Sequence, residues 1–338
     1  MVLSETHTSV GISCLVVFLA ALSCTATTIP QIKTPAPGFF RLMLGDFEIT
    51  ALHDGTVPFN MDEIMPTVPK EEMIHALHHE DIPLPVTGTI NAFLVNTNDH
   101  LVLIDTGVGI LFGNCCGLLQ ANLLAAGYRP EQIDYVFLTH LHSDHEAGLA
   151  PHGTMAFPNA VVRTSQPEVD YWLDAANRVN ATDYWKQYFD WAAAAVAPYR
   201  ATKQFQPFNS TDGDLVPGIR PHTRFGHTPG HSPYFVESRG QTLVAWGDIT
   251  HFEAVQLPNP AATVMFDYNQ TEARKARLDL IELVVKNKYL VAGAHIAFPG
   301  IGHVHRQAGP RSKGQRYLWV PVRYDSDPTS LKTANFSI

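Results

Sequence analysis

The sequence has few cysteines and no excess of basic residues. Its 338 residues include four cysteines, and 23 lysines and arginines stand against 32 aspartates and glutamates, which gives a formal net charge of −9. The basic residues are dispersed and form no stripe that could neutralise phosphates, which argues against nucleic-acid binding. The chain also has no evident internal repeat or low-complexity tract. With 45% hydrophobic and 16% charged residues, it can bury one large core as a single domain.

An uncharged apolar run at residues 10–24 is followed by small residues. About fifteen residues is short for a bilayer-spanning helix, which needs roughly 20 apolar residues. The run is typical of a secretion signal, although no lysine or arginine precedes it. We therefore expect a signal peptide over residues 1–26, with a lipoprotein or membrane anchor as the alternative. The expected location is outside the cytoplasm, periplasmic or secreted, with or without a lipid anchor.

Removal of that segment leaves two cysteines, Cys115 and Cys116, which are adjacent in the sequence. Neighbouring residues rarely reach unstrained disulfide geometry. We expect free, partly buried thiols on a helix that follows Phe112, and no disulfide framework in the mature chain.

The most informative motif is the run from Thr139 to His145. It directly follows the apolar segment Asp134 to Leu138, which is typical of a buried strand. Four side chains that bind metals fall within six residues of this run: His140, His142, Asp144 and His145. Loops at strand ends are where catalytic groups usually lie. The run therefore predicts part of a metal site.

Three further ligands are expected downstream, each after or at the end of an apolar, strand-like run: His227, Asp248 and His295. The seven side chains divide into two groups that Asp248 bridges. His140, His142 and His227 would hold one ion, and Asp144, His145 and His295 the other. A set of imidazoles and carboxylates without thiolates suits zinc first, with manganese, cobalt or iron as alternatives. Because the chain has 17 histidines, chance clustering is the alternative, but chance rarely gives this spacing and order.

With these ligands, the chain resembles the metallo-β-lactamase superfamily. Five segments further resemble methyl parathion hydrolase and its lactone- and aryl-ester-hydrolysing relatives: residues 39–54, 101–113, 157–163, 226–231 and 298–303. The resemblance covers about residues 30–324. It implies an α/β fold, the αβ/βα four-layer sandwich with a dinuclear site at one edge, and a homodimer. We therefore expect a hydrolase domain over residues 27–324 and a loose tail over 325–338.

Departures from other branches of the superfamily narrow the chemistry. Asp248 stands where one class of β-lactamases carries cysteine, and other lactamase classes lack this bridging aspartate, so antibiotic hydrolysis is disfavoured. His142 stands where flavin-linked di-iron reductases have a carboxylate, so a reductase is disfavoured too. Mono-iron persulfide dioxygenases share much of the ligand set and remain an alternative, as does a non-catalytic zinc-binding protein.

The ligand set predicts a hydrolytic mechanism. Two divalent ions lower the pKa of a bridging water, from 15.7 to about 7 in the best-known zinc case, and so supply a hydroxide nucleophile. Asp144 and Asp248 are the expected catalytic carboxylates, with Asp144 taking up or relaying the proton. Asp105 and Asp54 are expected to orient metal-bound imidazoles, with turn capping as the alternative for each. His231 is expected to be structural.

The resemblance also indicates a substrate pocket formed by Phe112, Trp172, Phe189, His251 and Phe266. Aromatic walls suit a flat, aryl-bearing substrate, and the alternative for each residue is an ordinary core position. His251 and Phe266 are larger than the aliphatic residues of the dedicated phosphotriesterase, so they should crowd a tetrahedral phosphotriester. The prediction is a lactone or aryl-ester hydrolase with weak phosphotriesterase activity. The alternative is an organophosphate triester hydrolase.

Local patterns predict several elements of secondary structure. Hairpins are expected over 40–52 and 92–104. Helices are expected over 118–126, ending at Gly127, over 183–196 and over 272–286. Ser165 and Glu168 have the spacing of a capping box at the start of another helix. Residues 60–86 predict a loop and short helix over the mouth of the site, with His75 and His79 on a solvated face.

Overall fold

The computed structural model describes residues 29–307 and 316–324. The chain divides into two units, one ending at Ala36 and one beginning at Pro37. The described part of the first unit, residues 29–36, contains no helix or strand. The predicted signal peptide and C-terminal tail lie outside the described residues. Within those residues, no helix combines the length and apolar character that a membrane crossing requires.

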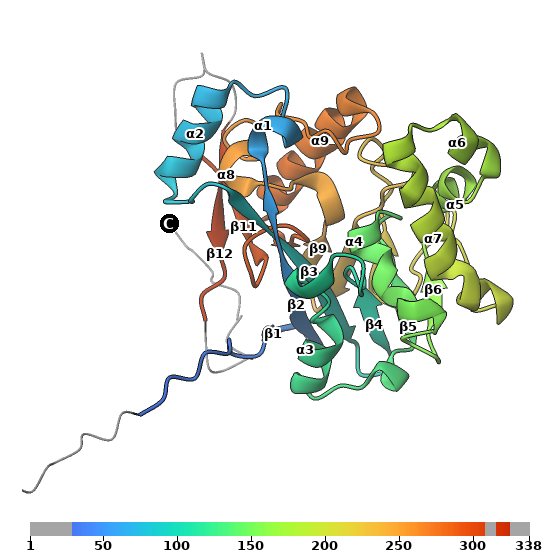
Figure 1. Ribbon diagram of the computed structural model, residues 1–338. Helices are drawn as coiled ribbons and strands as arrows, with labels where there is room; N and C mark the ends of the chain where they lie inside the picture. Colours follow the sequence, from blue (N-terminus) through green and yellow to red (C-terminus); the bar gives the residue numbers. More distant parts are fainter. Residues whose placement is uncertain (1–28, 308–315, 325–338) are drawn as a thin grey trace, which may run out of the picture. The chain divides into compact units, whose positions relative to one another are not determined.

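The second unit is built on two six-stranded sheets (Figure 1). The first contains, in spatial order, β1 (Phe39–Leu44), β2 (Phe47–Phe59), β3 (Val86–Asn96), β4 (Leu101–Ile104), β5 (Tyr135–Phe137) and β6 (Val161–Arg163). The second contains β12 (Tyr317–Pro321), β11 (Ile301–Arg306), β10 (Leu290–Ala292), β9 (Gln241–Ala245), β8 (Tyr234–Ser238) and β7 (Ile219–Pro221). Both predicted hairpins are confirmed, although β2 extends beyond the expected end at Leu52.

Each sheet contains parallel strands that bring ligand-bearing loops to one edge. In the first sheet β4, β5 and β6 are parallel, and in the second β9 and β10 are parallel. The carboxyl ends of parallel strands lie on the same side of a sheet. The loops after β5, β9 and β10 carry six of the seven predicted metal ligands, and the seventh, His227, lies in the loop between β7 and β8.

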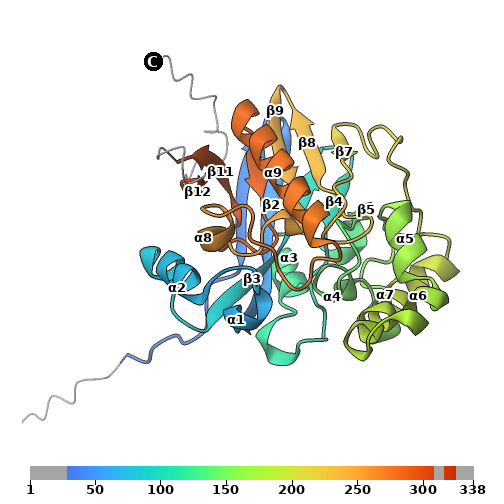
Figure 2. The same cartoon turned by 90° about the horizontal axis from the view of Figure 1, so that it is seen from above.

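Helices cover the outer faces of the sheets. They are α1 (Met61–Ile64), α2 (Lys70–His79), α3 (Leu119–Ala125), α4 (Ser143–Glu146), α5 (Gln166–Trp172), α6 (Ala175–Asn180), α7 (Asp183–Ala201), α8 (Glu253–Gln256) and α9 (Gln270–Asn287). Figure 2 shows α9 along the second sheet, with α5, α6 and α7 grouped on the side of β5. The predicted helices before Gly127, from Asp183 and near Glu272 are all present. The helix expected to carry the cysteines is instead a short 3-10 turn, Gly113–Cys115.

Strand β4 shows why the layers form in this order. Its residues are buried on both faces, and they alternate between two hydrophobic clusters. Leu101 and Leu103 belong to the cluster shared with α3 and α7, whereas Val102 and Ile104 belong to the cluster between the two sheets. Side chains of a strand point alternately to its two faces, so β4 links a helix layer to the second sheet. A third cluster joins the second sheet to α9. The predicted four-layer sandwich is confirmed.

The segment from residue 60 to 86 forms α1, α2 and connecting loops, two helices where one short helix was predicted. Met73 and Leu77 of α2 are buried against Phe252 and Val255. His75 and His79 are exposed on the same helix. The amphipathic pattern therefore fixes which face of α2 packs against the rest of the unit.

Candidate metal centre

The His-rich run leaves β5 and turns into α4. His140 lies in the connecting loop, and His142 immediately precedes the helix, with extended backbone at φ −81° and ψ 150°. Asp144 and His145 lie within α4 itself. Asp248 follows β9 in the 3-10 turn Gly247–Ile249.

One group of ligand atoms gathers around His227. Its Nε2 lies 3.2 Å from Nε2 of His140 and 3.0 Å from Nδ1 of His142. The same atom lies 3.1 Å from Oδ2 of Asp248. The ligand atoms of these four residues all lie within 4.8 Å of one another. They form the first of the two predicted groups.

A second group gathers on the other side of Asp248. Nε2 of His145 and Nε2 of His295 each lie 3.2 Å from Oδ1 of Asp248. Oδ2 of Asp144 lies 3.6 Å from the His145 nitrogen and 3.4 Å from the His295 nitrogen. Oδ1 of Asp248 thus faces the second group, whereas Oδ2 faces the first group and also lies 3.3 Å from Nε2 of His295. The structure brings together all seven predicted ligand side chains.

The electrostatics of the cluster fit divalent cations. Burial lowers the pKa of His140 and of His142 well below the ordinary value, so both rings are neutral and offer lone pairs. Burial raises the pKa of Asp248, but the imidazoles around it, His295 first, overcome this effect and hold that pKa well below its usual range. Nε2 of His145 and Oδ1 of Asp248 are buried and have no hydrogen-bond partner among the described residues. Burial also lowers the pKa of His145, His227 and His295, but the carboxylates near them, Asp248 first, outweigh burial and raise these pKa values, to about 9 for His227. Metal binding would release the protons that these three rings then hold, and imidazoles with an ionised carboxylate are a suitable donor set for zinc-like ions.

Hydrogen bonds hold the outer nitrogens of four of these imidazoles. Nδ1 of His145 lies 2.9 Å from Oδ2 of Asp105, the arrangement predicted for that carboxylate. The other contacts were not predicted: His227 Nδ1 with Asp267 Oδ1 at 3.0 Å, His140 Nδ1 with Thr139 Oγ1 at 3.0 Å, and His295 Nδ1 with the Thr89 carbonyl at 2.9 Å. Such contacts fix the tautomer that turns the other nitrogen toward a metal.

The ring of His142 is held differently, by three aromatic side chains. Trp185 stacks on it with 5.7 Å between ring centroids and 27° between planes. Trp172 and Tyr188 approach it edge-on, at 5.3 Å and 5.6 Å. Ring packing here takes the place of the hydrogen bond that orients the other imidazoles.

The role predicted for Asp54 needs correction. Its carboxylate accepts hydrogen bonds from the backbone N–H of Val108 at 2.9 Å and of Leu119 at 3.0 Å, rather than from an imidazole of the cluster. These two amides lie near the ends of the loop between β4 and α3. Asp54 therefore anchors that loop, in line with the alternative of turn capping.

The predicted capping box is also wrong, because its side chains bond to distant loops. Ser165 donates its hydroxyl hydrogen to the Gly230 carbonyl at 2.7 Å. The buried Glu168 carboxylate accepts from the backbone N–H of Leu141 at 3.0 Å and of Gly230 at 2.6 Å, and from the Thr228 hydroxyl. Glu168 therefore ties the loop of His140 to the loop of His227.

His231 is structural, as expected. Its Nε2 accepts a hydrogen bond from the backbone N–H of Asp248 at 3.0 Å. Burial lowers the pKa of His231 to about 3, so the ring is neutral and can act as this acceptor. The contact fixes the backbone of the bridging carboxylate.

A cavity opens beside the metal ligands. Its apolar lining residues are Phe59, Gly88, Phe112, Tyr188, Phe252 and Phe266, and its other lining residues are His142, Asp144, Asp248, His251 and His295. Phe112, His251 and Phe266 lie where predicted. Trp172 and Phe189 are instead buried in the core, with 3% and 2% exposure, because they pack behind His142 rather than around the cavity. Phe59, Phe252 and Tyr188 were missed, since no local pattern distinguishes a pocket aromatic from a core aromatic.

His251 lies closest to the chemistry among the pocket residues. Its Nε2 is 3.0 Å from Oδ2 of Asp248. Its ring is parallel to that of His295, with 5.1 Å between centroids and 8° between planes. His251 therefore both lines the cavity and contacts the bridging carboxylate.

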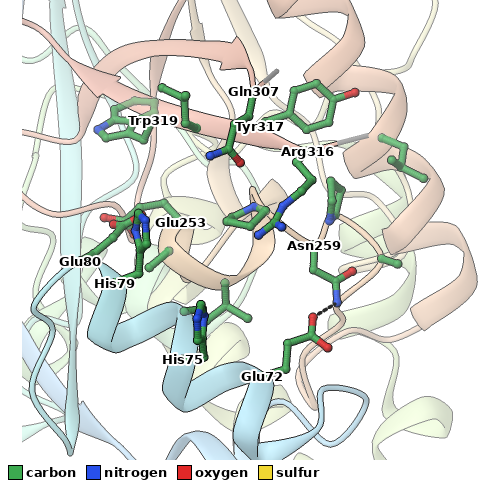
Figure 3. A pocket seen from close by; sticks show the side chains of 18 of the residues that line it. Glu72, His75, His79, Glu80, Glu253, Asn259, Gln307, Arg316, Tyr317 and Trp319 are labelled. Carbon is green, nitrogen blue, oxygen red and sulfur yellow. Dashed lines mark hydrogen bonds between the residues drawn. The ribbon is translucent and has the colours of Figure 1, made fainter. Parts of the chain in front are cut away.

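A larger cavity, of about 870 Å³, lies between α2, α8, α9 and β12 (Figure 3). Its polar lining includes His75, His79, Glu80 and Glu253. Among the described residues, none of the groups with ligand atoms close enough to share a metal ion belongs to this cavity. Its size therefore does not make it the catalytic site.

Comparisons with known proteins agree with this geometry. A sequence profile of the Metallo-beta-lactamase superfamily matches residues 85–295. A probable metallo-hydrolase of Mycobacterium bovis is 26% identical over 235 residues, which cover 58% of this chain and 73% of the relative. An N-acyl homoserine lactonase of a Bacillus species is 24% identical over 222 residues, covering 60% of this chain and 79% of the relative.

Solved structures extend the comparison. The hydrolase AbOPH, described as a member of the beta lactamase superfamily, is 33% identical, with a TM-score of 0.81 over 86% of this chain and 100% of its own. The dizinc quorum-quenching lactonase AidC is 24% identical, with a TM-score of 0.76 over 85% of this chain and 98% of its own, and this likeness concerns the fold. The chain therefore belongs to the metallo-β-lactamase superfamily and is a metal-dependent hydrolase.

Proposed function

We propose that this protein hydrolyses lactones or aryl esters with two divalent metal ions, zinc first, and has weak phosphotriesterase activity. The observation that carries the proposal is the position of Asp248. Its Oδ2 approaches the group of His227, and its Oδ1 approaches His145 and His295; Oδ2 also lies 3.3 Å from Nε2 of His295. A carboxylate shared in this way between two donor sets, beside an aromatic cavity, suits a two-metal hydrolase.

The residues around the cluster have separable tasks. Two cations held there would lower the pKa of a shared water toward neutrality and draw charge from a substrate carbonyl. The Asp144 side chain is 22% exposed and lines the cavity, so it can take up the proton released during attack and pass it to the leaving group. Asp105 and Asp267 keep their imidazoles in the tautomer that faces the metals. No serine or cysteine nucleophile is required.

The cavity wall supports the choice of substrate class. Phe112 and Phe266 provide flat apolar surfaces beside Asp144 and Asp248, which suits a planar ring or an aryl group. His251 and Phe266 occupy space that the three substituents of a tetrahedral phosphotriester would need. The Bacillus relatives named N-acyl homoserine lactonases support a lactone as the electrophile.

The alternatives make different demands on the site. A mono-iron persulfide dioxygenase needs one metal, whereas this cluster contains a second donor group of Asp144, His145 and His295. That second group disfavours the dioxygenase. An organophosphate triester hydrolase would use the same two metals and differ only in the pocket, so the order of substrate preference decides between them.

A substrate panel with metal analysis on the same sample tests the proposal. The panel contains γ- and δ-lactones, dihydrocoumarin, phenyl acetate and methyl paraoxon, assayed on the purified full chain. We expect two equivalents of metal and a higher kcat/KM for a lactone or for phenyl acetate than for methyl paraoxon. Highest efficiency on methyl paraoxon would select the phosphotriesterase. One equivalent of iron with oxygen uptake on glutathione persulfide, or bound metal without any turnover, would overturn the proposal.

Two substitutions in the cluster test the site itself. His142→Ala and Asp248→Asn should each abolish turnover, because each removes a ligand, while the far-ultraviolet circular dichroism stays like that of the wild type. A near-wild-type rate in either variant would exclude this cluster as the catalytic site.

We further propose that the protein is exported and forms a homodimer. The first rests on the apolar N-terminal run and the second on the resemblance to dimeric relatives. Fractionation of expressing cells and light scattering on the purified protein test the two separately: protein retained in the cytoplasm contradicts export, and a monomer mass contradicts the dimer.

A further inference from the structure

Cys115 and Cys116, the two cysteines among the described residues, form a sulfur pair at the surface. Sγ of Cys115 and Sγ of Cys116 are 3.1 Å apart. Both are free thiols; Cys115 is exposed, whereas Cys116 is buried. One sulfur is thus open to small reagents in solution, and its neighbour is already in contact with it.

The pair belongs to the loop that forms one wall of the active-site cavity. Phe112, three residues before Cys115, lines that cavity. The Cys115 thiol donates a hydrogen bond to the Phe112 carbonyl at 3.1 Å. Cys116 packs in a small hydrophobic cluster with Ile90 and Val108, against which Phe112 also packs. Both sulfurs are therefore linked directly to the pocket wall.

The ends of this loop are fixed, and glycines flank its two cysteines. Asp54 holds the amides of Val108 and Leu119. On either side of the cysteines, Gly113 and Gly117 have positive φ angles of 67° and 84°, which glycine adopts readily. The anchored ends confine a change at the sulfur pair to the loop in which Phe112 lies.

We propose that Cys115 and Cys116 are a peroxide-responsive modification site that closes reversibly into a disulfide between adjacent residues and shifts Phe112 in the substrate pocket. Hydrogen peroxide oxidises the exposed Cys115 thiol to a sulfenic acid and releases one water. Sγ of Cys116 then attacks the Cys115 sulfur and loses its proton, and the hydroxyl group leaves as a second water. In sum, two thiols are oxidised to one disulfide and one peroxide is reduced to two waters.

The environments of the two sulfurs suit this order of events. Burial raises the pKa of the Cys116 thiol, so it stays protonated and is shielded from peroxide until Cys115 has reacted. A disulfide between neighbours is strained, and strained disulfides are easily reduced. Adjacency, which argues against a permanent structural bridge, therefore favours a reversible one.

Closure has a geometric consequence for substrate binding. A disulfide brings the sulfurs to about 2.05 Å, roughly 1 Å closer than they lie now, and removes the Cys115 hydrogen that bonds the Phe112 carbonyl. The expected effect is a several-fold rise in KM for an aryl ester, with unchanged metal content. This kinetic expectation rests on the proposed function, whereas the modification itself does not.

The experiment treats the reduced full chain with hydrogen peroxide and maps its chymotryptic peptides by mass spectrometry. We expect the peptide that contains both cysteines to lose two hydrogen atoms and to regain them with dithiothreitol. Cys115→Ser is the matched control: it keeps the size and exposure of the residue, should show wild-type basal kinetics, and should not respond to peroxide. Cys116→Ala provides a second variant that cannot close.

Two results would overturn the inference. One is a peptide that stays reduced, or that only gains oxygen at Cys115, under peroxide concentrations that oxidise small-molecule thiols. The other is a disulfide that forms in the wild type without a change in KM relative to Cys115→Ser, which would show that the disulfide does not affect the pocket wall. Because the mass measurement needs no turnover, failure of this inference is distinguishable from failure of the proposed function.

Discussion

Replacing Asp267 with asparagine should weaken metal binding at the group that contains His227. Asp267 Oδ1 lies 3.0 Å from His227 Nδ1, and its Oδ2 accepts from the Val264 amide at 3.1 Å, with Arg277 3.7 Å away. Asparagine has one acceptor oxygen and one NH₂ group. If the oxygen faces Val264, the NH₂ group donates to His227 Nδ1 and moves the imidazole proton to Nε2, the atom that faces the metals. If the amide is turned around, the NH₂ group opposes the donors of Val264 and Arg277.

The first arrangement puts a proton on the nitrogen that binds the metal, and the second leaves a buried polar contact unmade, which costs about 1–3 kcal/mol. Loss of a comparable partner of a metal-bound histidine typically lowers metal affinity ~10–100-fold, or about 1.4–2.8 kcal/mol. The expected cost of the unmade contact and the expected loss of metal-binding free energy therefore agree. The assay is zinc competition against a chromophoric chelator, performed on metal-free wild type and variant.

Asp190→Asn is the matched control. It removes the same charge from an exposed ion pair between Asp190 of α7 and Arg178 of α6, and should leave zinc affinity unchanged. Zinc affinity in Asp267→Asn within twofold of the wild type would refute the role assigned to Asp267.

Three further substitutions probe other parts of the site. Trp185→Leu removes the ring stacked on His142 and should lower metal affinity by ~10-fold, measured by the same zinc competition. The control Trp191→Leu, on the same helix, should leave metal affinity unchanged. Equal losses of affinity in the two variants would contradict the stacking role. Glu168→Gln leaves at least one buried donor without an acceptor and should lower the free energy of unfolding in urea by about 1–3 kcal/mol. An unchanged midpoint of the urea unfolding curve would refute the role assigned to Glu168. Phe266→Leu should raise kcat/KM for methyl paraoxon relative to phenyl acetate, and a falling ratio would contradict the proposed crowding.

The metal ligands could be predicted because their signals are local. Four lie within one run after a strand, and each of the other three follows or ends an apolar, strand-like segment. Strand ends are set by short-range sequence, and parallel strands deliver their loops to a common edge. Asp105 could be predicted as a partner of a metal-bound imidazole in the same way, because it directly follows β4.

The missed residues depend on contacts between distant segments. Asp267 meets His227 across 40 residues of sequence, and nothing around Asp267 marks it as a partner of a metal ligand. Ser165 and Glu168 have the spacing of a capping box, but their side chains instead form hydrogen bonds with loop amides and a loop carbonyl more than 25 residues away in the sequence. Trp172 and Phe189 failed as pocket residues for a related reason: whether an aromatic ring lines a cavity or fills a core is decided by tertiary packing.

The central claim is that two cations share Asp248. Crystals of zinc-loaded protein, with diffraction data collected on both sides of the zinc absorption edge, test it most directly. We predict two anomalous peaks, one coordinated by His140, His142 and His227 and the other by Asp144, His145 and His295, with one Asp248 oxygen on each. A single peak, or two peaks away from Asp248, would contradict the account.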